Sequence, residues 1–413
     1  MTVDEKANSP VENTTESSVR AVLVLPAPPD TSIVEEWYRR KIVGVPFLLL
    51  NLLNLQKGGV ERLVVFHPGI FSSGQHPLAD LAEDSRLQVP VEWISDIETL
   101  DQRLGDRSCR LAVNGAALHD KADIAAILDG SLEPERAEVI GMTTVAREGA
   151  RRIAEIFEQG SEASSAEVSN PEEAGDAEQT LVVLTGSSAT QVRRDEDFQV
   201  QRERLLTQGG MASDSFMDRW VSRHCSRQFT RLLIDTAVTP NQITWLHVTA
   251  GVVSAWFFYQ GTYAMVVTGA VLLMISAWLD ATDGEVARLR FQQSRFGMIL
   301  DVIGDNVVHW AVFLGIGWGA AHITGNEIYK YCGVLSMIGA MISFWLLEAS
   351  VFKKRSGGDF QSSGWQDELA NRDFLYFLFV MALVDQLNIF IVITAVGSNI
   401  FAGFVFYKKR KAS

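Results

Sequence analysis

Four aspartates lie within two apolar stretches of the C-terminal half of the chain, each long enough to span a lipid bilayer. They are Asp280, Asp283, Asp301 and Asp305. A charged side chain near membrane depth costs about 3 kcal/mol or more unless a cation or a water-filled cavity compensates it. We therefore expect these carboxylates to have a function.

Helical spacing places the acids on two faces. Asp280 and Asp283 are three residues apart, and Asp301 and Asp305 follow Gly297 at intervals of four. Residues three or four apart share one face of a helix. Two short turns would bring the faces together and create a cluster of hard oxygen ligands suited to Mg²⁺ or Mn²⁺. Such a set does not suit zinc, which would want His or Cys.

The same segment fits the pattern D-x2-DG-x2-AR-x8-G-x3-D-x3-D at every fixed position. This pattern resembles the signature of the CDP-alcohol phosphotransferase (CDP-alcohol phosphatidyltransferase) family. The resemblance implies a six-helix membrane enzyme in which an acceptor alcohol attacks the β-phosphorus of a CDP-linked alcohol and CMP leaves. It also implies Mg²⁺ or Mn²⁺ as the cofactor, with two ions expected. The alternative, solvated loop acids between two core helices, leaves Asp301 and Asp305 unexplained.

The resemblance assigns roles to individual residues. Asp280, Asp283 and Asp301 are expected to ligate the metal. Asp305, one turn deeper, is expected to take the proton from the acceptor hydroxyl or to share in metal binding. The residues expected on the nucleotide side are Asn241, Asp280, Gly284, Ala287, Arg288 and Gly297. Small residues also pack membrane helices without a ligand, and Asn241 also fits a simple helix start.

Six apolar runs follow residue 241, at roughly 242–260, 263–281, 297–321, 329–352, 374–386 and 387–407. Basic residues gather after the second, fourth and sixth runs: Arg288, Arg290 and Arg295; Lys353, Lys354 and Arg355; and Lys408, Lys409, Arg410 and Lys411. The positive-inside rule places these connections, the active site and the N-terminal half in the cytoplasm, which requires an even number of spans. We therefore expect an integral protein of the cytoplasmic membrane, with an all-α six-helix domain over 241–413.

Three of these basic residues are candidates to hold an acceptor phosphate. Arg295 comes first, with Lys353 and Lys354 after it, because all three lie nearest the expected cytoplasmic mouth. They would bind the phosphate by charge-assisted hydrogen bonds. The positive-inside rule alone would also place charges there.

A basic stripe precedes the first apolar run. Arginines recur every four residues among apolar side chains, at Arg219, Arg223, Arg227 and Arg231. This spacing predicts an amphipathic helix within 211–240 that lies in the membrane interface. Attraction to lipid headgroups explains such a stripe, and binding of an anionic substrate by Arg223 or Arg227 is the alternative.

The net charge of −14 resides in residues 1–210, since the C-terminal half is nearly neutral. So acidic a half is unsuited to neutralising nucleic-acid phosphates. Cys109, Cys225 and Cys332 are odd in number and far apart, which predicts reduced, structural thiols. Residues 1–17 are polar and lack the apolar segment of a signal peptide, so they predict a disordered tail.

Residues 18–207 predict an α/β domain with a mostly parallel sheet. The expected strands are 21–25, 62–66, 91–94, 110–113 and 180–184, with a helix over 47–56 and an acidic, flexible insertion at 159–178. Their order resembles sugar-phosphate nucleotidyltransferases. In particular, it is similar to the cytidylyltransferase halves fused to CDP-alcohol phosphotransferases that make di-inositol phosphates.

Residues needed for nucleotidyl transfer are missing from this domain. Related enzymes follow the first strand with a glycine-rich, basic loop whose backbone N–H groups cradle the triphosphate. Here three prolines follow Leu25, and no glycine precedes Gly44. Ala116 stands where a metal-binding Asp is expected, Asp120 is displaced by about one helical turn, and Lys41 is the match for the family's basic residue. We therefore expect a degenerate domain retained for binding, assembly or regulation.

Two classes of function follow from these patterns. The first is a transferase of phospholipid biosynthesis that moves a substituted phosphate group from a CDP-alcohol, expected to be CDP-diacylglycerol, to an alcohol. A CDP-inositol-using di-inositol-phosphate-type synthase with an active cytidylyltransferase half is a variant of it. The second is a non-catalytic, membrane-anchored nucleotide-binding protein.

The intact acid pattern favours the transferase. The expected partners are then the donor, an alcohol or polyol-phosphate acceptor and the lipid bilayer, without nucleic acid. The identity of the acceptor and formation of a homodimer stay open.

Overall fold

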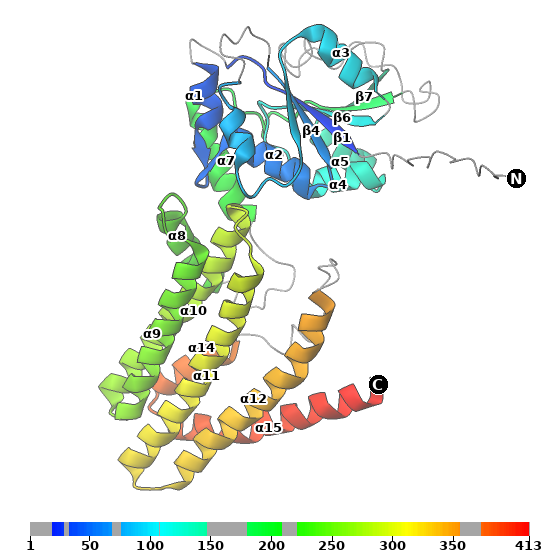
Figure 1. Cartoon of the computed structure of the whole chain (residues 1–413). Helices are drawn as coiled ribbons and strands as arrows, with labels where there is room; N and C mark the ends of the chain where they lie inside the picture. The colour runs from blue at the N-terminus through cyan, green and yellow to red at the C-terminus, as the bar shows by residue number, and fades with distance from the viewer. Residues whose placement is uncertain are drawn as a thin grey trace, which may run out of the picture. The chain divides into compact units, whose positions relative to one another are not determined.

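The computed structural model describes residues 19–28, 33–67, 76–106, 108–146, 180–208, 221–355 and 373–412. The chain divides into two compact units, Met1–Glu203 and Arg204–Ser413 (Figure 1). The tail predicted at 1–17 and the insertion predicted at 159–178 lie outside the described residues.

The N-terminal unit contains a six-stranded sheet in the order β5-β4-β1-β6-β8-β7. Its strands are β1 (Arg20–Val24), β4 (Arg62–Phe66), β5 (Val91–Ile94), β6 (Cys109–Asn114), β7 (Met142–Ala146) and β8 (Thr180–Leu184). Neighbouring strands are parallel except β7, which pairs antiparallel with β8 at one edge. The prediction of a mostly parallel sheet is confirmed, and β7 is a strand that the sequence analysis did not anticipate.

Helices cover both faces of this sheet, which explains why its strands are apolar runs rather than alternating ones. Figure 1 shows α2 (Phe47–Lys57) and α4 (Lys121–Asp129) on one face and α3 (Ile97–Gly105) on the other. The remaining elements are α1 (Val34–Arg39), β2 (Lys41–Ile42), β3 (Val45–Pro46), the 3-10 helix η1 (Ala79–Glu83), α5 (Pro134–Val139) and α7 (Asp195–Gln208).

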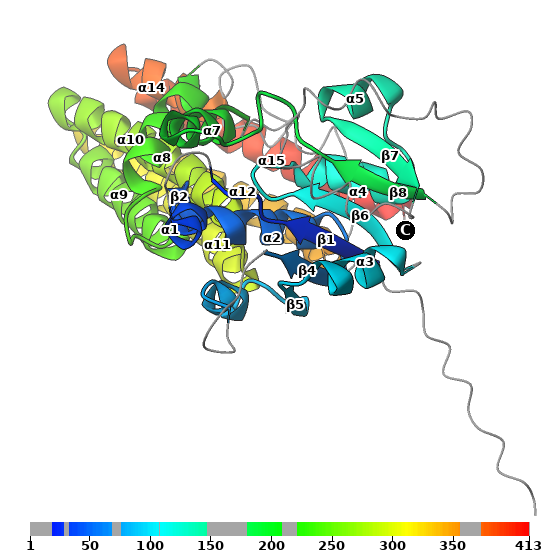
Figure 2. The ribbon, with the colours of Figure 1, turned by 90° about the horizontal axis from the view of Figure 1, so that it is seen from above.

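The order in which the chain adds strands to the sheet changes direction between β1 and β6. The chain passes from β1 to β4 and β5 on one side and returns to β6 and β8 on the other, as Figure 2 shows from above. In open α/β sheets, ligands bind at such a switch point, beside the carboxyl ends of the strands. Val24 and Asn114 end the two strands here.

The C-terminal unit is helical. Its described helices are α8 (Arg223–Leu233), α9 (Pro240–Gln260), α10 (Tyr263–Leu289), α11 (Arg295–Thr324), α12 (Ile328–Arg355), α14 (Asp373–Leu383) and α15 (Leu387–Ala412). Within the described part, four segments are long and apolar enough to cross a membrane: Tyr263–Leu289, Arg295–Thr324, Ile328–Leu346 and Leu387–Lys411. The count of six spans therefore stays a prediction.

Glycines let these helices pack with their backbones in contact. A Cβ on Gly315 or Gly319 of α11 would overlap the carbonyl oxygens of Ala255 and Phe258 on α9. A Cβ on Gly317 would lie 2.8 Å from the carbonyl oxygen of Tyr329 on α12. Small residues at such crossings are typical of membrane helices, whose association depends on close packing.

Candidate metal centre

A capping box fixes the start of α9. The Oγ1 atom of Thr239 accepts a hydrogen bond from the backbone N–H of Gln242, and the Oε1 atom of Gln242 accepts one from the N–H of Thr239 at 2.9 Å. This reciprocal pairing satisfies two amides that have no acceptor within the helix. Pro240 follows in the first turn, where its fixed φ suits a helix. The helix start predicted from the sequence is thus found.

Two helices bring three of the predicted carboxylates together. Asp280 and Asp283 are buried on α10, and Asp301 projects from α11. Ser294 caps α11 by accepting from the N–H of Gly297 at 3.0 Å, which fixes the start of the helix two turns before Asp301. The ligand atoms of the three acids lie within 4.8 Å of one another.

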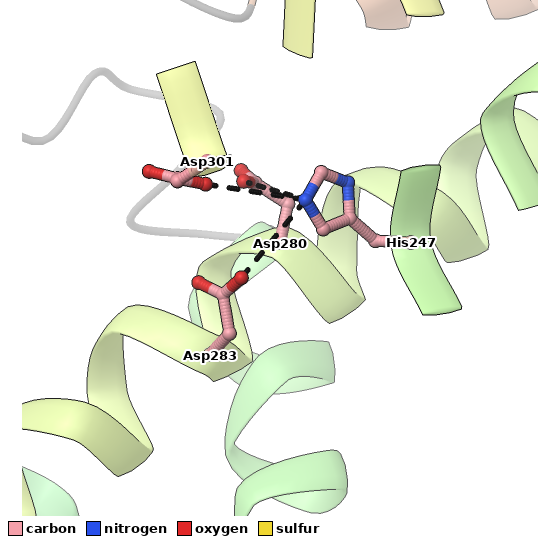
Figure 3. Close-up of side chains that lie close together, drawn as sticks. All are labelled: His247, Asp280, Asp283 and Asp301. Atoms are coloured by element: carbon pink, nitrogen blue, oxygen red, sulfur yellow. Dashed lines mark ion pairs between the residues drawn. The ribbon is translucent and has the colours of Figure 1, made fainter. Parts of the chain in front are cut away.

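A histidine that the sequence analysis did not consider completes this group. His247 of α9 is 1% exposed, and its Nε2 lies 3.8 Å from Asp280 Oδ1. The same nitrogen lies 3.9 Å from Asp283 Oδ2 and 3.9 Å from Asp301 Oδ1 (Figure 3). A sequence signal existed, because His247 is a lone ionisable residue inside an apolar run, the criterion that singled out the aspartates.

Close packing lets His247 reach the acids. A Cβ on Gly304 of α11 would overlap Val248 and would lie 4.0 Å from Cε1 of His247. A Cβ on Gly251 of α9 would lie 2.5 Å from the Val308 methyl groups on α11. The hydroxyl of Ser276 on α10 donates to the backbone carbonyl of His247 at 2.7 Å. The backbone of His247 is therefore held against α10, and Gly304 leaves room on α11 for the edge of the ring.

A hydroxyl orients one of the carboxylates. The Oγ1 atom of Thr244, one turn before His247, donates to Asp283 Oδ2 at 2.5 Å. Hydrogen bonds of this kind hold metal-ligating carboxylates in place and tune their basicity. Three carboxylate oxygens and one imidazole nitrogen form a donor set that fits a divalent cation such as Mg²⁺ or Mn²⁺.

Four of the residues predicted on the nucleotide side lie close together in two pairs. A Cβ on Gly297 would lie 2.7 Å from Asn241 Oδ1, so the first turns of α9 and α11 are adjacent. A Cβ on Gly284 would lie 3.2 Å from an Nη atom of Arg288, which shows that this side chain folds back over the glycine. Ala287, one residue before Arg288 on α10, is half-buried.

Other predicted residues lie outside the cluster. Asp305 is half-buried one turn beyond Asp301 and does not belong to the group of four ligand atoms. Arg295 is exposed at the first position of α11. Lys353 and Lys354 lie in α12, but their side chains are not among those described.

Helix α8 is anchored to α10 by a buried carboxylate that the sequence analysis passed over. Glu285 accepts from Arg223 Nη1 at 2.7 Å, from the Ser226 hydroxyl at 3.2 Å and from the Thr230 hydroxyl at 2.6 Å. The side chain of Glu285 is 6% exposed. Arg223 therefore pairs within the protein, and neither the lipid-headgroup nor the anionic-substrate interpretation describes its observed contact.

Arg290 closes the other end of α8. Its guanidinium donates to the backbone carbonyls of Leu233, Ile234, Thr236 and Val238, the last at 2.6 Å. These carbonyls belong to the last residue of α8 and to residues after it, where intrahelical donors are missing. Arg290 was predicted as a charge of the cytoplasmic loop, whereas it is 6% exposed and acts as a helix cap.

In the N-terminal unit, polar groups near the switch point are hydrogen-bonded within the fold. The N–H of Gly115 donates to the carbonyl of Val24 at 2.7 Å, and the amide of Asn114 donates to the carbonyl of Thr185. Asp120, the displaced acid of the sequence analysis, caps α4 by accepting from Ala122 N. These groups are engaged in holding the fold together.

Two other positions of this unit, Ala116 and Lys41, were compared in the sequence analysis with nucleotidyltransferase residues. Neither supplies a carboxylate that could bind a metal. Ala116 donates its N–H to Asn114 Oδ1 at 3.0 Å, and Lys41 is exposed on β2. No disulfide joins the three cysteines, all of which are described.

Two histidines lie beyond the carboxyl end of β4. His67 Nδ1 and His76 Nε2 are 2.9 Å apart, and the His76 ring stacks on Trp93 with centroids 4.1 Å apart. Burial lowers the pKa of His67 and lowers the pKa of His76 to about 4. Both rings are thus held in the neutral form near neutral pH.

The fold and the site define a helical domain with membrane-type segments and an acidic, metal-binding cluster between its first three long helices. Residues 237–402 match the family model of CDP-alcohol phosphatidyltransferases. This match agrees with the pattern that runs from Asp280 to Asp305.

Two curated relatives share this region. A bifunctional IPC transferase and DIPP synthase of Thermococcus kodakarensis is 30% identical over 171 residues, which cover 41% of this chain and 38% of that protein. The protein of the same name from Aquifex aeolicus is 37% identical over 98 residues, covering 24% and 22%. The matches thus span well under half of these relatives' length.

A solved structure is also similar. It is Mycobacterium tuberculosis phosphatidylinositol phosphate synthase with CDP-DAG bound, at 22% identity and a TM-score of 0.35. The match covers 45% of this chain and 92% of that one. A TM-score this low does not define a common fold.

Proposed function

We propose that the chain is a membrane-embedded, divalent-metal-dependent transferase that moves a substituted phosphate group from a CDP-alcohol to an acceptor alcohol and releases CMP. The observation that carries this proposal is the convergence of Asp280, Asp283 and Asp301 within a domain of the CDP-alcohol phosphatidyltransferase family. Carboxylates this close together repel one another unless a cation offsets their charge.

The three aspartates are proposed to hold the metal, Mg²⁺ or Mn²⁺, with two ions as the expected number. When bound, the metal offsets the charge of the CDP pyrophosphate and of the departing CMP. Asp283 is oriented for this role by Thr244. Since α9 supplies Thr244, α10 supplies Asp283 and α11 supplies Asp301, the site depends on the packing of all three helices.

The nucleotide is proposed to lie beside the first turns of α9 and α11. Gly297 leaves room next to Asn241, whose carboxamide can donate and accept hydrogen bonds. Gly284 leaves room under Arg288, whose guanidinium suits phosphate oxygens. Ala287 completes the row of small side chains on α10.

Asp305 is proposed as the general base for the acceptor hydroxyl. It lies one turn beyond Asp301 on the same helix and outside the group of four ligand atoms. A carboxylate close to the metal but not ligating it can take a proton from the hydroxyl that attacks phosphorus. If the acceptor carries a phosphate, Arg295 is proposed to hold it, with Lys353 and Lys354 as further candidates.

CDP-diacylglycerol is the proposed donor, because the matched family is named for phosphatidyl transfer. CDP-inositol is the second candidate. It is favoured by the name of the two relatives, bifunctional IPC transferase and DIPP synthase. The prolines after Leu25 and the alanine at position 116 argue against an active cytidylyltransferase half, so the N-terminal unit is proposed to serve binding, assembly or regulation.

The domain is proposed to span the membrane six times, with α9 and α14 in addition to the four long apolar segments. The N-terminal unit, the metal centre and the C-terminus would then face the cytoplasm, as the basic connections indicate. A reporter fused after Ser413 tests this topology. A periplasmic reporter would refute the six-span arrangement.

The direct test of the proposed function is CMP release by the full-length protein in lipid nanodiscs. CDP-diacylglycerol and CDP-inositol are each offered with glycerol phosphate, inositol phosphate, inositol and serine, in Mg²⁺, Mn²⁺ or EDTA. We expect CMP from one donor with its acceptor and none in EDTA. CMP from neither donor with any acceptor would favour the non-catalytic nucleotide-binding alternative. Pyrophosphate release from CTP plus inositol phosphate would show that the N-terminal unit is active.

A further inference from the structure

His247 is the one member of the described cluster that is not a carboxylate. Its Nε2 is almost equally distant from acid oxygens of Asp280, Asp283 and Asp301, at 3.8, 3.9 and 3.9 Å. Figure 3 shows the ring pointing into the space between the two acid-bearing helices. A nitrogen in this place lies where a fourth ligand of a shared ion would lie.

We propose that Nε2 of His247 ligates the divalent cation and makes the centre prefer Mn²⁺ to Mg²⁺. This inference rests on the proposed function, which supplies the three carboxylate ligands and the role of the ion. It adds a ligand from α9 to those from α10 and α11.

The distances suit a shared ion. With metal–ligand bonds of about 2.1 Å, two ligands of one ion lie about 3.0–3.4 Å apart when adjacent and about 4.2 Å apart when opposite. The four ligand atoms here lie within 4.8 Å of one another. Closing them onto one ion requires shifts of well under about 1 Å each, within the range of side-chain rotation.

The position of the ring is built into the packing. The Ser276 hydroxyl holds the backbone carbonyl of His247 from α10, and Gly304 admits Val248 and the ring edge from α11. Thr244 lies one turn earlier on the same face of α9. Its hydroxyl donates a hydrogen bond to the carboxylate of Asp283, which also lies close to Nε2 of His247. A buried ring on a backbone fixed in this way is preorganised for binding, which lowers the entropy lost when the ion binds.

An imidazole ligand changes which metal the site prefers. Mg²⁺ binds oxygen ligands and keeps several of its waters, whereas Mn²⁺ is a first-row ion which, although the weakest binder of that series, is bound by sites that mix nitrogen and oxygen ligands. A site of three carboxylates alone would discriminate weakly between the two ions. Adding one nitrogen strengthens Mn²⁺ binding more than Mg²⁺ binding.

Pulsed electron paramagnetic resonance of bound Mn²⁺ tests the ligation directly. The full-length protein in nanodiscs receives one equivalent of Mn²⁺, and modulation of the electron spin echo by a bonded imidazole ¹⁴N is recorded. We expect this modulation in the wild type and its loss in His247→Ala. His322→Ala is the matched control, because His322 is exposed in the last turn of α11, far along the chain from Asp301.

Metal selectivity gives a second readout that needs no turnover. Titration calorimetry of the same samples yields the ratio of the Mg²⁺ and Mn²⁺ dissociation constants. We expect His247→Gln, which keeps a polar side chain of similar length, to lower this ratio about tenfold, in line with the usual loss on removing one metal-supporting group. His322→Ala should leave it unchanged.

The outcomes separate this inference from the proposed function. If wild-type protein binds Mn²⁺ and Asp280→Asn does not, yet the bound ion shows no ¹⁴N modulation, the ligation by His247 is refuted while the carboxylate centre stands. If Mn²⁺ does not bind even in the presence of CDP, both the inference and the proposed metal centre fail. An unchanged selectivity ratio in His247→Gln would overturn the preference for Mn²⁺.

Discussion

Each unit gathers polar side chains at a place where ligands bind in its fold class, but the two places differ in what those side chains contact. At the switch point of the sheet, Asn114, Gly115 and Asp120 are hydrogen-bonded to the backbone of their own unit. In the helical unit, Asp280, Asp283 and Asp301 crowd around one imidazole nitrogen. The first arrangement completes a fold, whereas the second concentrates charge that an ion can neutralise.

This difference teaches how to separate structural polar residues from functional ones. A neutral amide or a capping carboxylate is satisfied by a nearby N–H or C=O and contributes about 1 kcal/mol to stability. Three acids on two helices raise one another's energy, so the fold gains nothing from them without a cation. The predictions below test the comparison, beginning with the largest expected effect.

The largest expected difference between the two units lies in how CMP release and CDP binding respond to the loss of one carboxylate. Asp280→Asn or Asp283→Asn removes a charge that the metal needs, so CMP release should fall at least about 10³-fold and metal-dependent CDP binding should be lost with it. Asp120→Asn, at the switch point of the other unit, keeps an N-cap and should change neither. CMP release and CDP titration in nanodiscs measure both effects. Unchanged Mg²⁺-dependent CDP binding by Asp280→Asn would break the comparison.

Replacing Asp305 should lower turnover without preventing metal-dependent binding of CDP. Asp305→Asn keeps the size of the side chain but removes the base, so turnover should fall about 10²–10⁴-fold while metal-dependent CDP binding persists. The two are measured on the same preparation, with Asp301→Asn as the variant expected to lose both. Near-normal turnover by Asp305→Asn across the pH range would refute the assigned role.

Replacing Glu285, the buried carboxylate that anchors α8, should lower the local stability of this helix. Glu285→Gln leaves a buried arginine without its counter-charge, which costs about 3 kcal/mol or more of local stability. Amide hydrogen exchange in α8 should then be about a hundredfold faster.

A surface pair offers the matched control for this anchor. Glu327→Gln breaks the ion pair with Lys330, in which Glu327 is 67% exposed. Loss of such a pair should leave exchange unchanged. Equal effects of the two variants on α8 would show that burial does not govern the strength of the Glu285 anchor.

The smallest effect concerns the histidine pair of the N-terminal unit. Burial lowers the pKa of His76 from 6.5 to about 4, so the unfolded chain binds more protons than the folded one between these values. Stability is therefore complete above about pH 6.5, falls as the pH drops toward 4, and loses nothing further from this group below 4. The protection factors of amides in β4 and β5, which correct for the intrinsic pH dependence of hydrogen exchange, should fall over that window.

His76→Gln should flatten this dependence, because glutamine does not titrate. His224→Gln, on the exposed surface of α8, serves as the control and should retain the wild-type slope. Parallel pH profiles for the wild type and His76→Gln would show that the stacked ring does not govern the acid sensitivity of this edge of the sheet.

The sequence predicted elements whose signals are local. Strands β4, β5 and β8 have the bounds predicted from the sequence. The segment after Leu25 lacks the glycine-rich loop because prolines occupy it. Strand β7 was missed because its two threonines give a weak apolar signal. Its place depends on antiparallel pairing with β8, which is a long-range contact.

The metal centre was predicted in part for the same reason. Spacing along the chain placed Asp280 with Asp283 and located Asp301, since these relations follow from helix periodicity. His247 reaches them only through the packing of α9 against α10 and α11 at Gly251 and Gly304. The pairing of Arg223 with Glu285 likewise depends on how α8 docks, and helix periodicity alone assigned that arginine to an outer basic face.

The Glu285 anchor also sets an order of events during synthesis. Its hydroxyl partners Ser226 and Thr230 precede it by 59 and 55 residues. A ribosome adds about 5–20 residues per second, so α8 is complete for about 3–10 s before its anchoring carboxylate is made. Over that interval Ser226 and Thr230 lack the carboxylate with which they pair in the folded protein. The contacts that dock α8 on α10 can therefore form only after Glu285 has been synthesised.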